Sequence, residues 1–167
     1  AVGLPEGIKY INAGVLLVNL KLWREENIKE EFKKIIDRFN GKVPHHDQGI
    51  INCVGGERRI IVPIKYNLTS NNYSFDANTV KKMYFLDDYY SQSEVDAAIK
   101  NPVIVHFTTG LIGRPWEEGS NHPEREAFWN TVAKTPWNEL EMLPDSRKKS
   151  LKIFTFVYEH IPRGLFI

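Results

Sequence analysis

Apolar and β-branched runs mark the strands that the sequence predicts. Residues 10–20 are nearly all apolar, which is the pattern of a strand covered on both faces. Shorter runs at 58–64 and 81–87 predict two further strands, and the β-branched run at 103–105 predicts a short buried one. Residues 65–76 are rich in Asn, Ser and Tyr and are expected to form a loop.

Helical periodicity is clearest in residues 27–41. Asn27, with Glu30 three residues later, has the pattern of a capping box, and Gly41 is expected to end the helix. Its apolar residues fall on one stripe: Ile28, Phe32, Ile35, Ile36 and Phe39. This stripe predicts a helix that packs one face against a core.

Four more helices are expected. Residues 47–55 form one, with Asp47 as its N-cap and Gly55 as its terminator. Residues 91–101 form a short capped helix that leads into the strand at 103–105. The last two are a helix with Pro123 in its first turn and a closing amphipathic helix, 145–161, capped by Asp145.

Strands that alternate with helices favour an α/β domain with a mostly parallel sheet. In such sheets, ligands bind beyond the carboxyl ends of the strands, and His106 directly follows a predicted strand. A chain of 167 residues suits one domain with a substantial core. We expect residues 1–143 to belong to that domain and residues 144–167 to form a helical tail.

Composition narrows the class of protein. The chain has 42% hydrophobic and 26% charged residues, as ordinary globular proteins do, and its net charge of +1 provides no long-range attraction to nucleic acid. The single cysteine, Cys53, excludes an internal disulfide and favours a reducing compartment. No apolar run approaches the about 18–20 residues of a membrane-spanning helix, and no signal peptide opens the chain. A cytoplasmic protein is therefore expected.

The segment from His106 to Trp116 combines residue types that suit a metal and a diphosphate. A neutral histidine nitrogen can bind a metal, glycines let backbone amides approach an anion, and the planar fork of Arg114 matches phosphate oxygens. Taken alone, a histidine at this position favours the simpler interpretation of a strand-end histidine bonded to a backbone carbonyl. Two glycines and an arginine within the same segment favour a metal-diphosphate clamp.

Two further groups could contact a sugar. Asn12 precedes two small residues, so that its carboxamide could read hydroxyls while a ring packs on the backbone, although Asn and Gly also mark bulges. Asp47 and Gln48 could bond a hexose, although an N-cap role would explain Asp47 by itself. The adjacent His45 and His46 are metal-binding in type, but neighbouring side chains in a loop usually diverge.

Four motifs occur in a specific order: YINAGVLLVNLKLWREENI, HDQGIIN, IKYN and IVHFTTGLIGRPW. In this order and spacing they resemble the retaining glycosyltransferases of family 8, which include glycogenin and bacterial galactosyl- and glucosyltransferases of lipopolysaccharide and surface glycans. The resemblance implies a GT-A fold and a Mn²⁺-dependent transferase. Such an enzyme moves a hexose, galactose or glucose, from a UDP-sugar to a glycan, glycoprotein or glycolipid acceptor.

The resemblance also implies roles for individual residues. His106 matches the histidine that ligates the metal. The diphosphate contacts match Gly110 or Gly113, together with Arg114. The donor-sugar contacts match Asn12, Ala13, Asp47 and Gln48, of which Gln48 would lie near the anomeric carbon as the catalytic residue. Because the family lacks an agreed carboxylate nucleophile, a front-face mechanism is expected, in which the leaving diphosphate helps to deprotonate the acceptor.

The sequence departs from the family pattern in three ways. The loop between His106 and Arg114 is two residues longer than is usual, and arginine replaces the usual lysine. The Asp-x-Asp metal motif and the uridine-binding strands should precede Tyr10 and do not occur in these residues. We therefore expect the chain to be the C-terminal part of a catalytic domain, and residues 1–167 alone to be inactive.

Two alternatives to an enzyme stay open. A glycan-binding module or pseudoenzyme could retain the surface that faces the glycan and lack donor binding. A purely structural scaffold would leave the segment from His106 to Arg114 unexplained. The closing helix is also ambiguous, since its basic residues and its apolar surface (Leu151, Phe154, Val157, Tyr158 and Ile161) suit either packing on the domain or peripheral contact with an anionic membrane.

Overall fold

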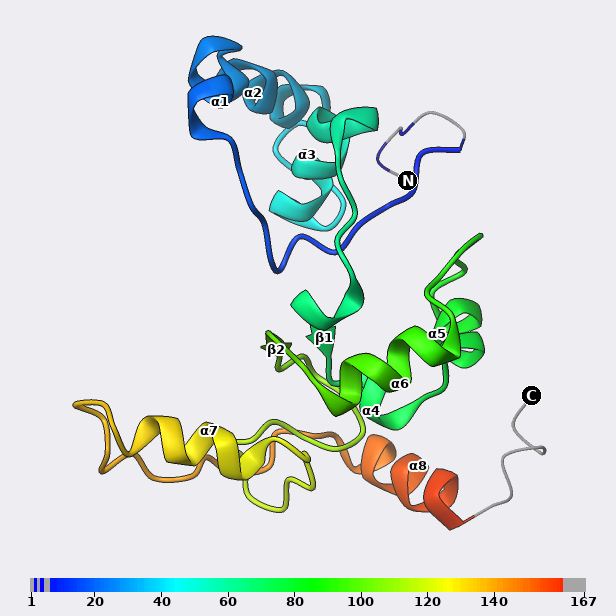
Figure 1. The fold of residues 1–167 in the computed structure, drawn as a ribbon, viewed down its shortest axis with the longest axis vertical. Helices are drawn as coiled ribbons and strands as arrows, with labels where there is room; N and C mark the ends of the chain where they lie inside the picture. Colours follow the sequence, from blue (N-terminus) through cyan, green and yellow to red (C-terminus); the bar gives the residue numbers. More distant parts are fainter. Residues whose placement is uncertain (1, 3, 5–6, 161–167) are drawn as a thin grey trace. The chain divides into compact units, whose positions relative to one another are not determined.

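The structure is a computed structural model that describes residues 2, 4 and 7–160. The chain divides into two compact units, Ala1–Pro63 and Ile64–Ile167, and each is described by itself. Figure 1 shows a helical first unit and a second unit in which two short strands lie among helices.

The first unit is built from α1 (Leu20–Glu25), α2 (Ile28–Arg38), α3 (His46–Gly55) and the 3₁₀ turn η1 (Gly56–Arg58). Helices α2 and α3 lie side by side (Figure 1), and Ile28 at the start of α2 is buried. The predicted helix at 27–41 is confirmed, and Gly41 ends it with φ +76°. The helix predicted at 47–55 is confirmed with a start one residue earlier.

The predicted N-caps of these two helices are wrong. Asn27 adopts the left-handed conformation and makes no side-chain cap bond, because its carboxamide can accept from the next turn only from an extended backbone. His45 is the N-cap of α3, also in the left-handed region, and Asp47 lies in the first turn of the helix. There its carboxylate can interact favourably with the helix dipole.

The strands predicted at 10–20 and 58–64 are absent from the described residues. Leu17 and Ile60 are exposed, and no described segment pairs with either stretch. A strand exists only where a neighbour accepts and donates its backbone hydrogen bonds. Both stretches have the apolar pattern of a strand, but no other described segment pairs its backbone with them.

The second unit contains two strands, β1 (Leu68–Thr69) and β2 (Val105–His106), which pair in parallel with Leu68 opposite Val105 and Thr69 opposite His106. Backbone bonds extend the pairing, since the amide of Ile104 donates to the carbonyl of Lys65 at 3.1 Å. The helices around them are α4 (Asn71–Ser74), α5 (Ala77–Met83), α6 (Gln92–Lys100), α7 (Arg125–Val132) and α8 (Lys149–His160), with a 3₁₀ turn, η2 (Ile64–Tyr66), before β1.

Three predictions for this unit require correction. Strand β1 and helix α4 lie within the stretch that was expected to be loop, and residues 81–87 form the end of α5 and a turn instead of a strand. Asp76 explains the second change, because its side chain accepts from the amide of Thr79 and starts a helix there. Val103 and Ile104 are exposed, so only the end of the predicted buried strand is a strand.

The core of the second unit lies where β1 meets α6. Leu68 and Val95 are fully buried, with Ile64, Ala77 and Ala98 packed around them. Helix α6 starts with a complete capping box, in which Ser91 and Glu94 bond each other's backbone amides. The helix predicted at 91–101 is thereby confirmed, and it buries the face of β1 on which the sheet depends.

Helix α8 packs on the second unit and begins later than predicted. Leu151 and Tyr158 contact a buried cluster of Phe75, Val80 and Leu111. Asp145 lies four residues before the helix and does not cap it, because its carboxylate is engaged by Arg147 and Lys152. Helix α7 similarly begins after Pro123, with Glu124 at its N-cap position.

The closing helix ends, in the described residues, at His160, so that Ile161 lies outside them. None of the helices among residues 2, 4 and 7–160 combines the length and the apolar character that crossing a membrane requires. The expected boundary between residues 143 and 144 stays a prediction.

The lack of a side chain at Gly49 allows the start of α3 to pack closely against the preceding loop. A Cβ atom at this buried position would lie 2.1 Å from the carbonyl oxygen of Pro44 and 3.1 Å from Cγ1 of Val43. We expect Gly49→Ala to lower the free energy of unfolding of the full-length protein by about 1–3 kcal/mol, measured by urea denaturation.

Gly55→Ala is the matched control in the same helix. Its Cβ would meet only the flexible side chain of Arg59, at 2.9 Å, so that the side chain can move aside. Equal stability of the Gly49 and Gly55 variants would contradict this packing.

Candidate functional site

The residues with predicted roles fall in both units. The first unit contains the four sugar-contact candidates, Asn12, Ala13, Asp47 and Gln48, and the second contains the metal and diphosphate candidates, His106, Gly110, Gly113 and Arg114. Each group is described within its own unit.

Gln48 and Ala13 are brought together by a hydrogen bond. Oε1 of Gln48, in the first turn of α3, accepts from the amide of Ala13 at 3.1 Å, and its Nε2 lies 3.4 Å from the hydroxyl of Tyr10. A carboxamide has one oxygen and two N–H donors. Both the oxygen and the nitrogen of the Gln48 carboxamide therefore bond the segment that contains the Asn-Ala-Gly motif.

Asn12 shapes the backbone of that segment. Its Oδ1 accepts from the amide of Gly14 at 2.8 Å, which forms a turn closed by the side chain. Asn12 and Asp47 are both exposed, Asp47 from the first turn of α3. Polar side chains in these positions can bond the hydroxyl groups of a sugar.

Asn52 is a residue that sequence reasoning missed. It is fully buried, and its carboxamide bonds the backbone of Ile11 in both directions, accepting at 2.8 Å and donating at 2.9 Å. Its Nδ2 also donates to the carbonyl of Gln48 at 2.8 Å, and Arg59 donates to its Oδ1. Asn52 thus joins the Asn-Ala-Gly segment to α3. Its place at the end of the HDQGIIN motif was the available signal.

His106 stands at the end of β2 with its ring oriented by one partner. Its Nδ1 lies 2.9 Å from Oδ1 of Asn67, the residue just before β1. In the tautomer that donates from Nδ1 to this carboxamide oxygen, Nε2 has a free lone pair. This is the arrangement in which a carbonyl partner orients a histidine that ligates a metal through its other nitrogen.

His106 fits the expected metal in donor type and could supply one ligand. Among residues 2, 4 and 7–160, no group of three or more His, Cys, Asp or Glu side chains is gathered in a way that could hold a metal ion. His45 and His46 are both exposed in left-handed backbone, and they form no such group with other described residues.

The glycines after His106 have different roles in the loop. A Cβ at Gly110 would lie 3.0 Å from Oδ1 of Asn71, so the loop approaches α4 closely there. Gly113 has φ +72°, a backbone conformation that residues with a side chain rarely adopt. Gly110 therefore favours glycine because of this close contact, and Gly113, which is buried, favours it because of its backbone conformation.

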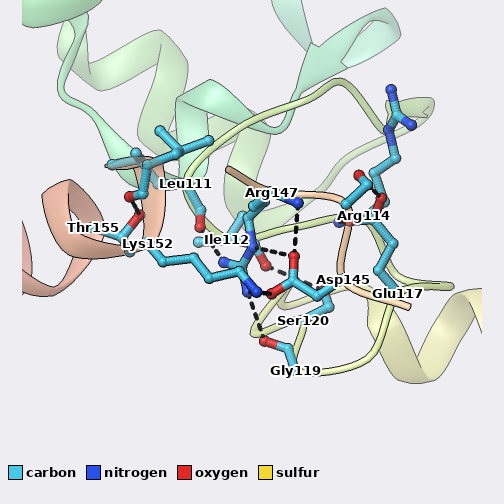
Figure 2. A network of polar contacts seen from close by, with 12 residues as sticks. Leu111, Ile112, Arg114, Glu117, Gly119, Ser120, Asp145, Arg147, Lys152 and Thr155 are labelled. Atoms are coloured by element: carbon cyan, nitrogen blue, oxygen red, sulfur yellow. Dashed lines mark hydrogen bonds and ion pairs between the residues drawn. The ribbon is translucent and has the colours of Figure 1, made fainter. Parts of the chain in front are cut away.

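Arg114 projects from a loop that is held at its base. Nη2 of Arg114 donates to Oγ1 of Thr109 at 2.8 Å, and its guanidinium carbon lies 5.8 Å from the ring centre of Trp116. The backbone amide of Arg114 donates to Oε2 of buried Glu117 at 3.1 Å. Figure 2 shows the Arg114 side chain pointing away from the polar network beneath it.

A buried histidine supports the other side of this loop. Nε2 of His122 lies 3.2 Å from Oγ of Ser70, and the same hydroxyl accepts from the amide of Thr108 at 3.1 Å. Nδ1 of His122 accepts from the amide of Glu124. Ser70 and His122 were not singled out in the sequence, because each role depends on a partner about 40–50 residues away.

The comparisons with known proteins identify the family. Residues 5–119 match the glycosyl transferase family 8. This chain belongs to glycosyltransferase family 8. It is 26% identical over 133 residues to lipopolysaccharide 1,2-glucosyltransferase of Escherichia coli, covering 78% of this chain and 36% of that one. It is 28% identical over 147 residues to lipopolysaccharide 1,3-galactosyltransferase of Salmonella typhimurium, covering 84% and 37%.

A solved structure shares the fold. The chain matches the crystal structure of an active-site mutant of LgtC with a TM-score of 0.55 and 20% identity, covering 79% of this chain and 45% of that one. The predicted α/β GT-A fold is confirmed as a partial one. This family 8 chain spans less than half the length of the curated relatives it matches.

His122 makes stability depend on pH. Burial lowers its pKa from 6.5 to about 4. Between these values the unfolded chain binds a proton that the folded chain excludes, so we expect the free energy of unfolding to fall as pH falls through this range, by on the order of 3 kcal/mol. Urea denaturation of the full-length protein between pH 7 and pH 4 measures the change.

His122→Gln replaces the imidazole by a carboxamide, which can still form hydrogen bonds but does not titrate. The free energy of unfolding of this variant should therefore depend less on pH. His46→Gln, at an exposed histidine, is the control and should preserve the dependence of the wild type. Parallel pH profiles for wild type and His122→Gln would contradict the assignment.

Proposed function

We propose that the full-length protein is a retaining hexosyltransferase that uses a UDP-sugar and Mn²⁺. The observation that carries the proposal is the geometry around His106, which lies at the end of β2. Its Nδ1 is bonded to Asn67, and the loop that follows it contains Gly110, Gly113 and Arg114. Membership of family 8 supports a transferase. A non-catalytic glycan-binding module is the alternative.

In this proposal Asn12, Ala13, Asp47 and Gln48 bind the donor sugar. Asn52 supports it by holding Gln48 and the backbone of Ile11 in one hydrogen-bonded group. Gln48 would lie near the anomeric carbon, and the LgtC structure with the same fold is described as an active-site mutant in which glutamate replaces a glutamine. The side chain of Gln48 can contribute dipoles to a developing positive charge at that carbon.

In the second unit, Nε2 of His106 would ligate the metal, and the amides of Gly110 or Gly113, with the guanidinium of Arg114, would bind the diphosphate. Bound Mn²⁺ would stabilise negative charge on the leaving diphosphate. Arg114 adds a fixed positive charge and a fork of donors to the same group.

The reaction would proceed on one face of the sugar. The bond from the anomeric carbon to the diphosphate oxygen breaks, the acceptor hydroxyl oxygen bonds to the same carbon from the same side, and its proton passes to the leaving diphosphate oxygen. No carboxylate nucleophile is required. Glucose and galactose are both candidate donor sugars, since relatives named for transfer of each match the chain to a similar degree.

His106→Ala tests the metal ligand in the full-length protein. We expect Mn²⁺-dependent binding of UDP, measured by calorimetry, to weaken by at least about tenfold, because loss of a direct ligand should cost no less than the loss of a group that only orients a ligand. His46→Ala is the control and should bind as the wild type does. Unchanged Mn²⁺ dependence and UDP affinity in the His106 variant would exclude this role.

We also propose that the protein is cytoplasmic and that α8 makes a peripheral membrane contact near a lipid-linked acceptor. Leu151 and Tyr158 pack on the domain, but Ile153 and Phe156 are about two-thirds exposed, at 65% and 64%. Lys148 and Lys149 are exposed at the start of the same helix. Each basic residue near an anionic surface contributes about 1 kcal/mol of attraction, which salt screens.

Vesicle co-sedimentation with Phe156→Ser tests this contact without disturbing the residues that pack on the domain. Binding to vesicles that contain anionic lipid should fall by about tenfold or more relative to the wild type, since burial of one large apolar side chain, about 1.5–3 kcal/mol, is lost. Phe85→Ser, at a phenylalanine exposed elsewhere in the unit, is the control. Equal binding by all three proteins, or binding indifferent to anionic lipid, would leave α8 with a packing role alone.

A further inference from the structure

One arginine from the C-terminal segment spans the loop that carries Gly113 and Arg114. Nη1 of Arg147 donates to the carbonyl of Leu111 at 2.5 Å, and Nη2 donates to the carbonyl of Gly119 at 3.1 Å (Figure 2). The two carbonyls bracket two of the candidate diphosphate-binding residues, Gly113 and Arg114, along the chain. A single guanidinium therefore fixes the distance between the two ends of this loop.

A carboxylate holds the guanidinium in place. Asp145 accepts from Nε of Arg147 at 3.0 Å and from Nη2 at 2.9 Å, and Nζ of Lys152 in α8 lies 2.8 Å from Oδ2 of the same carboxylate. The side chains of Arg147 and Asp145 are only 10% and 15% exposed, so that solvent screens the pair little. The hydrogen bonds from Arg147 and then Lys152 lower the pKa of Asp145, which keeps it ionised.

The loop is shaped to fit this arginine. A Cβ at Gly113 would lie 3.4 Å from the guanidinium carbon of Arg147, and the positive φ of Gly113 turns the chain around it. The Leu111 side chain packs in the cluster that Leu151 of α8 contacts. The C-terminal segment thus holds Leu111 by its backbone and by its side chain.

Across this loop, Oγ of Ser120 and the amide of Asn121 both donate to the carbonyl of Ile112, at 3.2 Å and 3.0 Å. These contacts close the loop on itself, and Arg147 lies within the closed turn. Because all three guanidinium nitrogens are engaged by loop carbonyls or by Asp145, the arginine acts on the loop and not on a ligand.

We propose that Arg147 is a positioning residue for donor binding: it sets the loop 111–119 so that Gly113 and Arg114 meet the donor diphosphate. The proposal rests on the proposed transferase function. It gives the segment from Asp145 to Lys152 a role in donor affinity that is independent of any membrane.

The test uses Arg147→Lys and Arg147→Gln in the full-length protein, with steady-state kinetics in which donor and acceptor are varied separately. We expect the donor KM to rise about tenfold in Arg147→Gln, because misplaced loop groups lose contact with the diphosphate, while the acceptor KM stays within about twofold. Arg147→Lys should fall between, since an ammonium can reach one carbonyl but cannot bridge two. Lys134→Gln, a change at an exposed lysine elsewhere in the second unit, is the control.

Hydrogen exchange of peptides that cover 110–121 provides a second readout that does not depend on turnover. Exchange there should quicken in Arg147→Gln, with peptides from α6 unchanged. An unaltered donor KM in both Arg147 variants of an active enzyme, or a parallel rise of donor and acceptor KM, would overturn the positioning role and leave the proposed function intact. A wild-type protein that consumes no nucleotide sugar would overturn both.

Discussion

The parallel pairing of β1 with β2 is the constraint on which the second unit's candidate site depends. It sets Thr69 opposite His106, so that the residues flanking β1 reach the residues that follow β2. Asn67 then orients the His106 ring, and Ser70 bonds the amide of Thr108. Leu68, fully buried under α6, holds this two-strand pairing in the core. This short ladder matters because it brings Asn67 and Ser70, which flank β1, to His106 and to the backbone of Thr108.

The loop beyond His106 is supported from two sides by polar groups. Ser70 and His122 support its first residues, and Arg147 with Asp145 supports its later ones. Such supports matter because a binding group must be held to within a fraction of an ångström to act on a ligand. In the first unit Asn52 is the corresponding support. It joins the backbone of Ile11 to the first turn of α3, where Gln48 lies.

Local chemistry in the sequence predicted some elements well and others poorly. Ser91 and Glu94 form the capping box that their spacing suggests, whereas Asn27 with Glu30 has the same spacing and does not cap α2. The difference is the backbone at the cap residue, extended at Ser91 and left-handed at Asn27, which follows from tertiary context. The apolar pattern alone could not show whether residues 10–20 and 58–64 form strands, because a strand also requires a neighbouring segment with which its backbone pairs. The candidate residues were located by ordered motifs, while their supports, Asn52, Ser70, His122 and Arg147, depend on contacts distant in sequence.

The central proposal is that this family 8 chain belongs to an enzyme that transfers a hexose with retention. The most direct measurement is incubation of the full-length protein with a panel of UDP-sugars in the presence and absence of Mn²⁺, following both donor consumption and the anomeric configuration of the product by NMR. The account predicts Mn²⁺-dependent consumption of at least one UDP-hexose and an α-linked product from the α-linked donor. Glycan binding with no consumption of any UDP-sugar would contradict it, and so would a product of inverted configuration.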